Sequence, residues 1–136
     1  MQRAGLFLWP LLWSLAGAAQ ACVPDLPGVA ANKLESPRYA LAYRTQPERI
    51  SVGRHFSVEL ALCADTGTPL PESVKVDAHM PEHRHGMNYK ASVTAQPGGR
   101  YRAEGLMFHM AGRWEFVFEL RAAGKTDRLT QSIVLD

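Results

Sequence analysis

The chain has 136 residues, long enough for one domain and too short for two ordinary ones. It carries 15 Lys and Arg against 13 Asp and Glu, and a net charge of +2 gives no electrostatic footprint for a nucleic acid. The sequence shows no internal repeat and no low-complexity segment. These properties exclude a repeat protein and argue against a nucleic-acid-binding module.

Residues 1–21 have the three regions of a secretory signal peptide. A positive start at Arg3 precedes an apolar stretch over residues 4–18, and Ala19-Gln20-Ala21 has the small-x-small pattern of a cleavage site. The apolar stretch is shorter than the ~20 residues that span a bilayer, and it contains Pro10. We therefore expect cleavage after residue 21 and no stable membrane anchor.

Cys22 and Cys63 are the two cysteines of the chain, and both remain after the expected cleavage. In an oxidising compartment a single pair is most simply a disulfide, which predicts a periplasmic or secreted protein. The bond would tether an extended tail, residues 22–36, to the end of an early strand. Two free thiols acting as metal ligands would need a reducing environment. Lipidation of Cys22 is a further alternative, but Ala19 stands where a lipobox has Leu, so we expect no acyl group.

Residues 37–136 show apolar and polar side chains in alternation, the pattern of half-buried strands. Turn signals such as Gln46-Pro47-Glu48 and Gln96-Pro97-Gly98-Gly99 separate these segments, and no helical period is present in the mature chain. The pattern predicts an all-β domain, an immunoglobulin-like antiparallel β-sandwich of about seven strands. The expected strands cover residues 39–44, 56–62, 74–80, 89–94, 101–108, 114–120 and 129–135.

Histidine and methionine are concentrated in two short segments, residues 79–87 and 107–110. Apart from Met1 the chain has five His and four Met, and the two segments hold four of these His and all four Met. Core packing scatters methionine as a gap filler and does not explain this concentration. The candidate metal ligands are His83, His85, Met87 and His109, with His79, Met107 and Met110 as further candidates.

The direction of the alternation changes across the first of these segments. Even positions such as Met80 face inward before it, whereas odd positions such as Tyr89 are expected to face inward after it. A bend must therefore lie between them, and Pro81 and Gly86 are expected to make it. Its imidazoles would lie at a sheet edge, and a sandwich can bring the turn at His109 to the same end.

Some of these residues also have purely structural interpretations. Met80 continues the inward row and is expected in the core, while His79 lies on the outward phase and could be a solvated histidine. Met107 or Met110 could pack under Trp114. The residues with the weakest structural interpretation are His83, His85, Met87 and His109.

Thioether and imidazole ligands without thiolate favour copper, because soft sulfur suits Cu(I) and imidazole serves both oxidation states. Zinc is the second choice, since three or four imidazoles can bind it tetrahedrally. Glu82 is the one carboxylate in the first segment, which argues against Ca²⁺ and Mg²⁺.

Two runs resemble the YtkA-like and FixH-like group of exported bacterial domains: Met80-Pro81-Glu82-His83-Arg84-His85-Gly86-Met87 and Phe108-His109-Met110-Ala111-Gly112-Arg113-Trp114. The pattern of that group resembles a Met-Pro-x-His-x-His-Gly-Met loop and then a Phe-x-Met-x-Gly-x-Trp turn that enters a strand. The resemblance covers about residues 50–136. It implies an immunoglobulin-like fold and suggests periplasmic copper handling. The membrane anchor of FixH is not expected in this chain.

The leading functional hypothesis is a periplasmic copper-binding protein that carries or buffers the ion, with a periplasmic cuproprotein or redox protein as its partner. The alternative is a metal-free interaction module, accessory to a periplasmic redox or transport complex. A small-molecule binder would need an apolar pocket between the sheets, a space that side chains normally fill in a domain of this size. No catalytic triad or carboxylate pair is recognisable in the sequence, so we do not expect an enzyme.

Overall fold

The structure, a computed structural model, describes residues 22–28 and 31–136. The expected signal peptide, residues 1–21, lies outside the described residues. The described part consists of strands, turns and loops, and none of it is a helix that could cross a membrane. Its strands are β1 (Asn32–Glu35), β2 (Tyr39–Gln46), β3 (His55–Ala64), β4 (Ser73–Met80), β5 (His85–Gly86), β6 (Ser92–Gln96), β7 (Arg100–Met107), β8 (Gly112–Ala122) and β9 (Lys125–Leu135).

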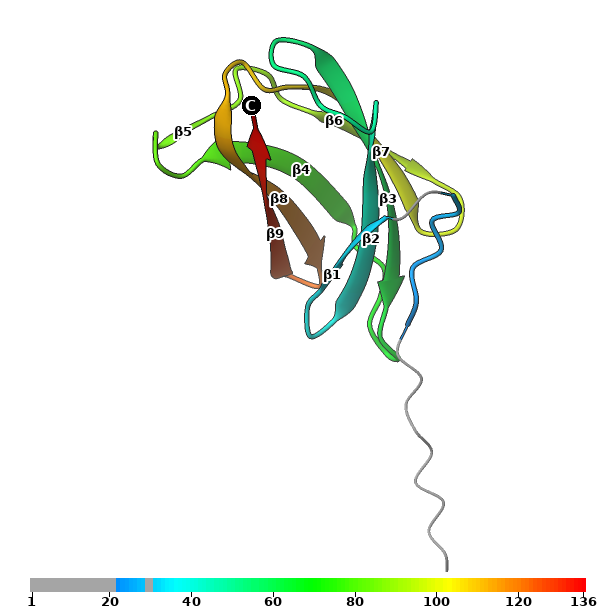
Figure 1. Cartoon of the computed structure of the whole chain (residues 1–136). Helices are drawn as coiled ribbons and strands as arrows, with labels where there is room; N and C mark the ends of the chain where they lie inside the picture. Colours follow the sequence, from blue (N-terminus) through cyan, green and yellow to red (C-terminus); the bar gives the residue numbers. More distant parts are fainter. Residues whose placement is uncertain (1–21, 29–30) are drawn as a thin grey trace, which may run out of the picture.

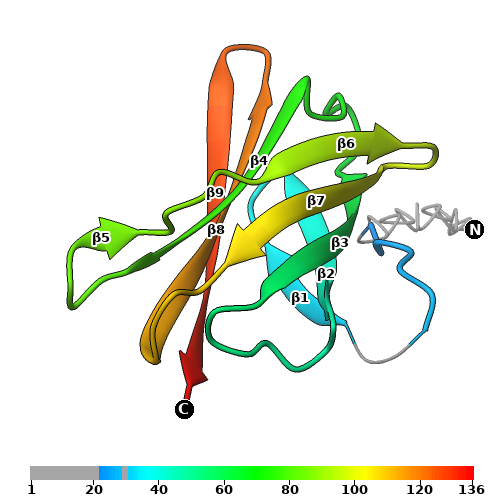
Figure 2. The same cartoon turned by 90° about the horizontal axis from the view of Figure 1, so that it is seen from above.

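The strands form two antiparallel sheets that face each other (Figures 1 and 2). One sheet has the order β1-β2-β3-β7-β6 and the other β5-β4-β8-β9. Without β1, these are the A-B-E-D and C′-C-F-G orders of an immunoglobulin-type sandwich. The predicted fold class is confirmed, although the described residues form nine strands where the sequence predicted about seven. The additional strands, β1 and β5, are too short to show alternation.

Alternation along the long strands builds the core between the sheets. The inward rows predicted for β2, β3, β4 and β8 are confirmed, because each such strand sends every second side chain toward the facing sheet. The largest fully buried side chains come from these rows and from the β7–β8 region: Trp114, Tyr39, Tyr43, Phe108, Phe116, Phe118, Leu41, Leu60, Met80, Leu106, Leu120 and Val58.

Residues 22–28 lie across the outer face of the five-stranded sheet. Three contacts hold them there: the Cys22–Cys63 disulfide, an ion pair of Asp25 with Arg100 at 3.3 Å, and a hydrogen bond of 2.7 Å from Arg44 Nη1 to the Pro27 carbonyl. The predicted disulfide is confirmed. Small outward residues of β2 and β3, such as Ala42 and Ala61, are also buried. Within the segment assigned to a tail, Asn32–Glu35 forms β1 and pairs with β2.

The strand predicted over residues 89–94 is shorter than expected. Strand β6 begins at Ser92, and Tyr89 is 47% exposed, so its predicted inward position is wrong. The Tyr89 ring instead packs edge-on against His55, with centroids 5.1 Å apart. Ala91 and Val93 are half-buried against the core, so the odd inward phase after the bend is otherwise confirmed.

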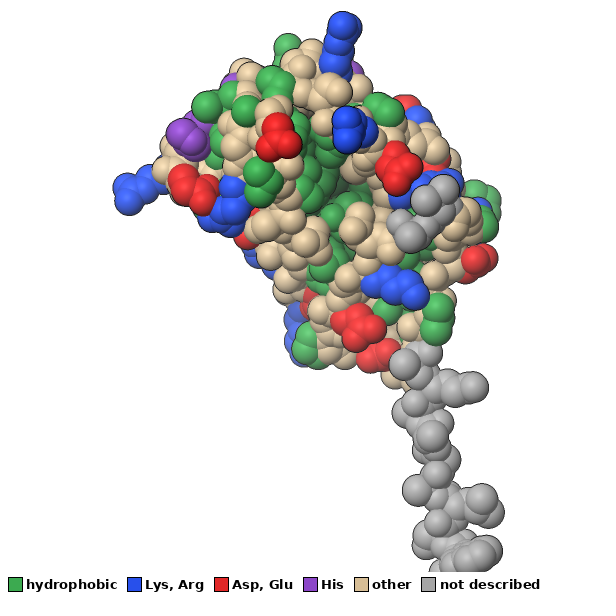
Figure 3. Space-filling view, viewed as in Figure 1, with side chains coloured by type: hydrophobic (Ala, Val, Ile, Leu, Met, Phe, Trp, Pro, Cys, Tyr) green, Lys and Arg blue, Asp and Glu red, His purple; other side chains and the backbone are tan. Residues whose placement is uncertain are grey.

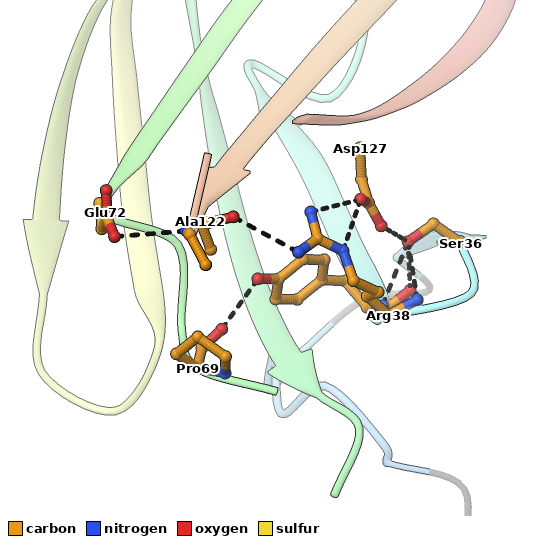
Figure 4. A network of polar contacts seen from close by, with 8 residues as sticks. Ser36, Arg38, Pro69, Glu72, Ala122 and Asp127 are labelled. Atoms are coloured by element: carbon orange, nitrogen blue, oxygen red, sulfur yellow. Dashed lines mark hydrogen bonds and ion pairs between the residues drawn. The ribbon is translucent and has the colours of Figure 1, made fainter. Parts of the chain in front are cut away.

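A polar network closes the end of the sandwich where β2, β4 and β9 begin (Figure 4). We call it the network end and define it by Ser36, Arg38, Tyr39, Pro69 and Asp127. The Asp127 carboxylate accepts hydrogen bonds from Arg38 Nε (2.8 Å) and Ser36 Oγ (2.6 Å). Arg38 Nη2 lies 2.7 Å from Asp127 Oδ1, and the Tyr39 hydroxyl donates to the Pro69 carbonyl at 2.8 Å. Burial alone would raise the pKa of Asp127, but the hydrogen bonds from Arg38 and Ser36 hold it below its ordinary value.

Candidate metal centre

The turn after β4 places the first two candidate histidines. The backbone N–H groups of His83 and Arg84 donate to the Met80 carbonyl at 3.2 and 2.9 Å, which closes a tight turn. Arg84 has a φ of 55°, a left-handed conformation that only a few per cent of non-glycine residues adopt. The predicted bend is confirmed, but Arg84 supplies its left-handed residue, whereas the expected Gly86 lies in β5 opposite His79.

An ion pair fixes this turn against the neighbouring strand. Glu82 Oε1 accepts a hydrogen bond of 2.6 Å from Arg113 Nε, at the start of β8. This hydrogen bond lowers the pKa of Glu82 below its ordinary value. The contact ties the turn that carries His83 to the strand that carries Trp114.

His85 points toward the end of the core. It pairs with the fully buried Met80, and directly opposed residues in an antiparallel pair share one face of the sheet. The His85 ring centroid lies 5.1 Å from that of His109 and 6.0 Å from that of Trp114. His83 is exposed, with its ring 5.7 Å from His85. Three imidazoles from two loops therefore meet beside one buried indole, and we call this region the histidine end.

The β7–β8 turn is built around Trp114. Phe108 stacks on Trp114 with centroids 4.4 Å apart, and the indole Nε1–H donates to the Met110 carbonyl at 3.0 Å. This bond from the first turn of β8 back to the preceding corner resembles the tyrosine corner of immunoglobulin domains. Gly112 has a φ of 122°, a backbone conformation that L side chains rarely adopt, and this favours glycine at the turn. The sequence indicated that Trp114 belongs to a motif, but it did not predict that the indole packs against His85 and His109.

His109 lies in this turn between Phe108 and Met110. Its ring is edge-on to Trp114, with centroids 5.4 Å apart. Its Nδ1 atom is buried and has no hydrogen-bond partner among the described residues. A buried polar atom without a partner costs free energy, so a bound group that gives this nitrogen a partner would be stabilised. A metal ion is one such group, because neutral imidazole coordinates through either nitrogen.

Two methionines accompany these histidines. The Met87 backbone N–H donates to the Ala78 carbonyl at 3.3 Å, which continues the β4–β5 ladder by one residue. Residues i and i+2 of a strand share a face, so Met87 follows His85 on the inner side. Met87 and Met110 are both half-buried against the core. The histidine end therefore offers thioether sulfur beside imidazole nitrogen.

Two of the candidate metal ligands lie away from the histidine end. His79 is on the outer face of the four-stranded sheet, where its Nε2 lies 3.6 Å from Glu115 Oε1. Met107 pairs with His55 at the end of β7, in register next to the buried pair Phe56 and Leu106, so it faces away from the core. The structure groups neither residue with His83, His85 and His109.

The spacing of the imidazole rings can be compared with the spacing expected for two rings bound to one metal ion. Two imidazoles bound tetrahedrally at ~2.0 Å per metal–nitrogen bond have ring centres roughly 5 Å apart. The His85–His109 spacing of 5.1 Å is close to this value, and the His83–His85 spacing of 5.7 Å is slightly longer. Within residues 22–28 and 31–136, however, no three His, Cys, Asp or Glu side chains are placed to hold an ion together. A site here would need small side-chain rotations or methionine ligands.

The fold and this end together define an immunoglobulin-like sandwich with a histidine- and methionine-bearing end. The sequence profile of the YtkA-like family matches residues 38–118, and the chain belongs to this family. The match includes the β4–β5 turn, the β7–β8 turn and Trp114. No curated protein matches the chain significantly. No solved structure does so either.

Proposed function

We propose that this protein binds copper at the histidine end and carries or buffers the ion outside the cytoplasm. His83, His85 and His109 would supply imidazole nitrogen, and Met87 and Met110 would supply thioether sulfur. Zinc is the second metal that these imidazoles would accept. The extracytoplasmic location rests on the Cys22–Cys63 disulfide, since such bonds persist in oxidising compartments.

One observation carries most weight: imidazoles from two separate turns meet, and the buried Nδ1 of His109 lacks a partner among the described residues. A purely structural histidine cluster would gain stability by pairing this atom. The mixed donor set favours copper over zinc, because soft thioether sulfur suits Cu(I) and does not suit Zn²⁺ as well. His83 is exposed and His85 is half-buried, which leaves the site open to a partner that delivers or takes the ion.

The test is a competition titration with Cu(I) under reducing agents and with Cu(II) in their absence. We expect one tightly bound copper per chain, and we expect the pair H83A/H85A to abolish tight binding of both ions. Met87→Leu should weaken Cu(I) more than Cu(II), because it removes the soft ligand and keeps the apolar volume. The matched control is His55→Ala, whose ring packs against Tyr89 and not against the histidine end.

Equal copper affinity in the parent and the double variant would place the metal elsewhere. The alternative function, a metal-free interaction module accessory to a redox or transport complex, would then take the lead. Metal analysis of the protein purified from its own compartment separates the two, since the copper carrier should contain substoichiometric copper that rises when copper is added. A protein that stays metal-free under both conditions supports the interaction module.

A further inference from the structure

Strand β9 is the last strand of the four-stranded sheet and has β8 as its neighbour on one side (Figure 1). It extends from Lys125 to Leu135 and pairs with β8 along its whole length. Its other side has no strand partner within residues 22–28 and 31–136. Alternate backbone N–H and C=O groups of β9 therefore point away from the sheet, where another strand can accept and donate hydrogen bonds.

The second half of β9 lacks the features that normally keep such an edge unpaired. Edge strands of monomeric proteins usually carry charged side chains, prolines or β-bulges. Residues 129–135 have the sequence Leu-Thr-Gln-Ser-Ile-Val-Leu, without charge or proline, and their pairing with β8 has no bulge. Val134 is 71% exposed. This half of β9 is therefore suited to pairing with a further strand.

An apolar recess lies beside this half of β9, between the two sheets. Figure 3 shows a hollow lined with hydrophobic side chains near the middle of the molecule. The larger of two adjoining cavities, about 440 Å³, has Ile50 and Val52 on one side and Val134 and Leu135 on the other. An exposed apolar surface of this kind, with polar residues at its margin, is typical of a protein interaction site.

The charges around the larger cavity indicate which partner fits. Arg49 from the β2–β3 loop and Asp136, directly after β9, both line it. Both residues are exposed, and neither forms an ion pair with another residue that the structure describes. A surface with one positive and one negative group beside an apolar strip is complementary to a copy of itself, because a two-fold rotation brings each charge to its opposite. An unrelated extended peptide has no such reciprocal match.

We propose that two copies of this protein form a dimer through the free edge of β9, with the two β9 strands antiparallel about a two-fold axis near Val134. Backbone hydrogen bonds join the two four-stranded sheets, and Ile133, Val134 and Leu135 of each copy pack against the same residues of the other. Arg49 of each copy pairs with Asp136 of the second copy. The dimer does not depend on the copper site, since none of the candidate metal ligands lines the recess.

Sedimentation velocity of the protein over about 5–500 µM tests this interface, because small interfaces have dissociation constants in the micromolar range. A chelator is present throughout, so that a shared metal ion cannot join the copies. The variants are V134D, R49D, D136R and the charge swap R49D/D136R. The matched control is V23D, because Val23 is 73% exposed but lies in the segment over the other sheet. Circular dichroism confirms that each variant keeps its β-sheet signal.

We expect the parent and V23D to change from monomer to dimer over this range, and V134D to remain monomeric. R49D and D136R should each weaken the dimer about tenfold or more, because each places like charges together across the interface. The double variant R49D/D136R restores opposite charges and should dimerise within about threefold of the parent.

A parent protein that stays monomeric at every concentration overturns the inference, even if an added peptide binds along β9. The inference is equally overturned if V134D dimerises as strongly as the parent, or if the charge swap dimerises no better than the two single charge variants.

Discussion

At the network end of the sandwich, the Asp127 carboxylate and the Tyr39 hydroxyl have hydrogen-bond partners within the chain. Arg38 Nη2 makes no hydrogen bond among the described residues, but it lies 2.7 Å from Asp127 Oδ1 in an ion pair. Toward the other end, Tyr43 and His109 each keep a buried polar atom without a partner in the part of the chain that the structure describes. Satisfied polar groups stabilise a fold, whereas unsatisfied ones cost stability unless something binds them. The difference indicates that the network end maintains the domain, whereas the unpaired nitrogen of His109 favours a bound group at the histidine end.

The largest expected effect comes from the disulfide, which joins residues 41 positions apart near the network end. Replacing both cysteines, C22S/C63S, should lower the free energy of unfolding by about 3–4 kcal/mol, because the unfolded chain gains conformational freedom. Urea unfolding of the parent and the double variant measures this difference. Copper affinity should not change, and a parallel loss of copper binding would mean that the two ends are not independent.

The next largest effect is expected at Asp127. D127A should cost about 2–3 kcal/mol at neutral pH, because it leaves the Arg38 guanidinium half-buried without its carboxylate. The pKa of Asp127 is lowered in the folded state, so its contribution is complete above the ordinary aspartate range and is lost as the pH falls through and below about 4. Stability measured from pH 7 to pH 2 should therefore fall less steeply in D127N than in the parent. Equal slopes would show that the carboxylate contributes nothing to acid sensitivity.

A pair of tyrosine variants compares the two ends with the same chemical change. Y39F should cost about 1 kcal/mol, since the Pro69 carbonyl loses its donor. Y43F should leave stability unchanged or raise it slightly, because its hydroxyl has no partner among the described residues. Thermal unfolding of the two variants beside the parent gives the comparison. A clear destabilisation by Y43F would mean that its hydroxyl is well bonded in solution.

The smallest effect on stability is expected from the pair H83A/H85A. His83 is exposed in a turn and His85 is half-buried at a sheet edge, so the metal-free variant should unfold within about 0.5 kcal/mol of the parent. Far-ultraviolet circular dichroism should show the same β-sheet signal for both proteins. A large loss of stability would make these imidazoles structural.

Much of the fold was predictable because the long strands alternate strictly. The rows around Phe56, Val76 and Trp114 were assigned to the correct face, and the phase change between β4 and the following strand was found from parity alone. Short strands such as β5 have too few residues to alternate. Burial of the outward residues Ala42 and Ala61 is a tertiary property that alternation along a strand does not predict.

The candidate site was predictable in part. Concentration of histidine in two turns indicated that His83, His85 and His109 would come together. In the structure the His85 ring lies between the other two and packs against both. The parity of β4 placed His79 on the outward phase, and the structure finds it beside Glu115. Met107 faces away from the core because it pairs with His55 in the sheet. The sequence alone does not reveal this pairing of β3 with β7. The partnerless Tyr43 hydroxyl also depends on tertiary packing.

The most direct test of the copper site is NMR of the isotope-labelled protein during addition of substoichiometric Cu(II), which broadens signals near the ion. We expect selective loss of the imidazole signals of His83, His85 and His109 and of the Trp114 indole signal. Signals of Ser36, Tyr39 and Asp127 at the network end, and of His55, should stay sharp. Equal broadening of His55 and the other histidines, or no broadening at the histidine end, would contradict copper binding at that end.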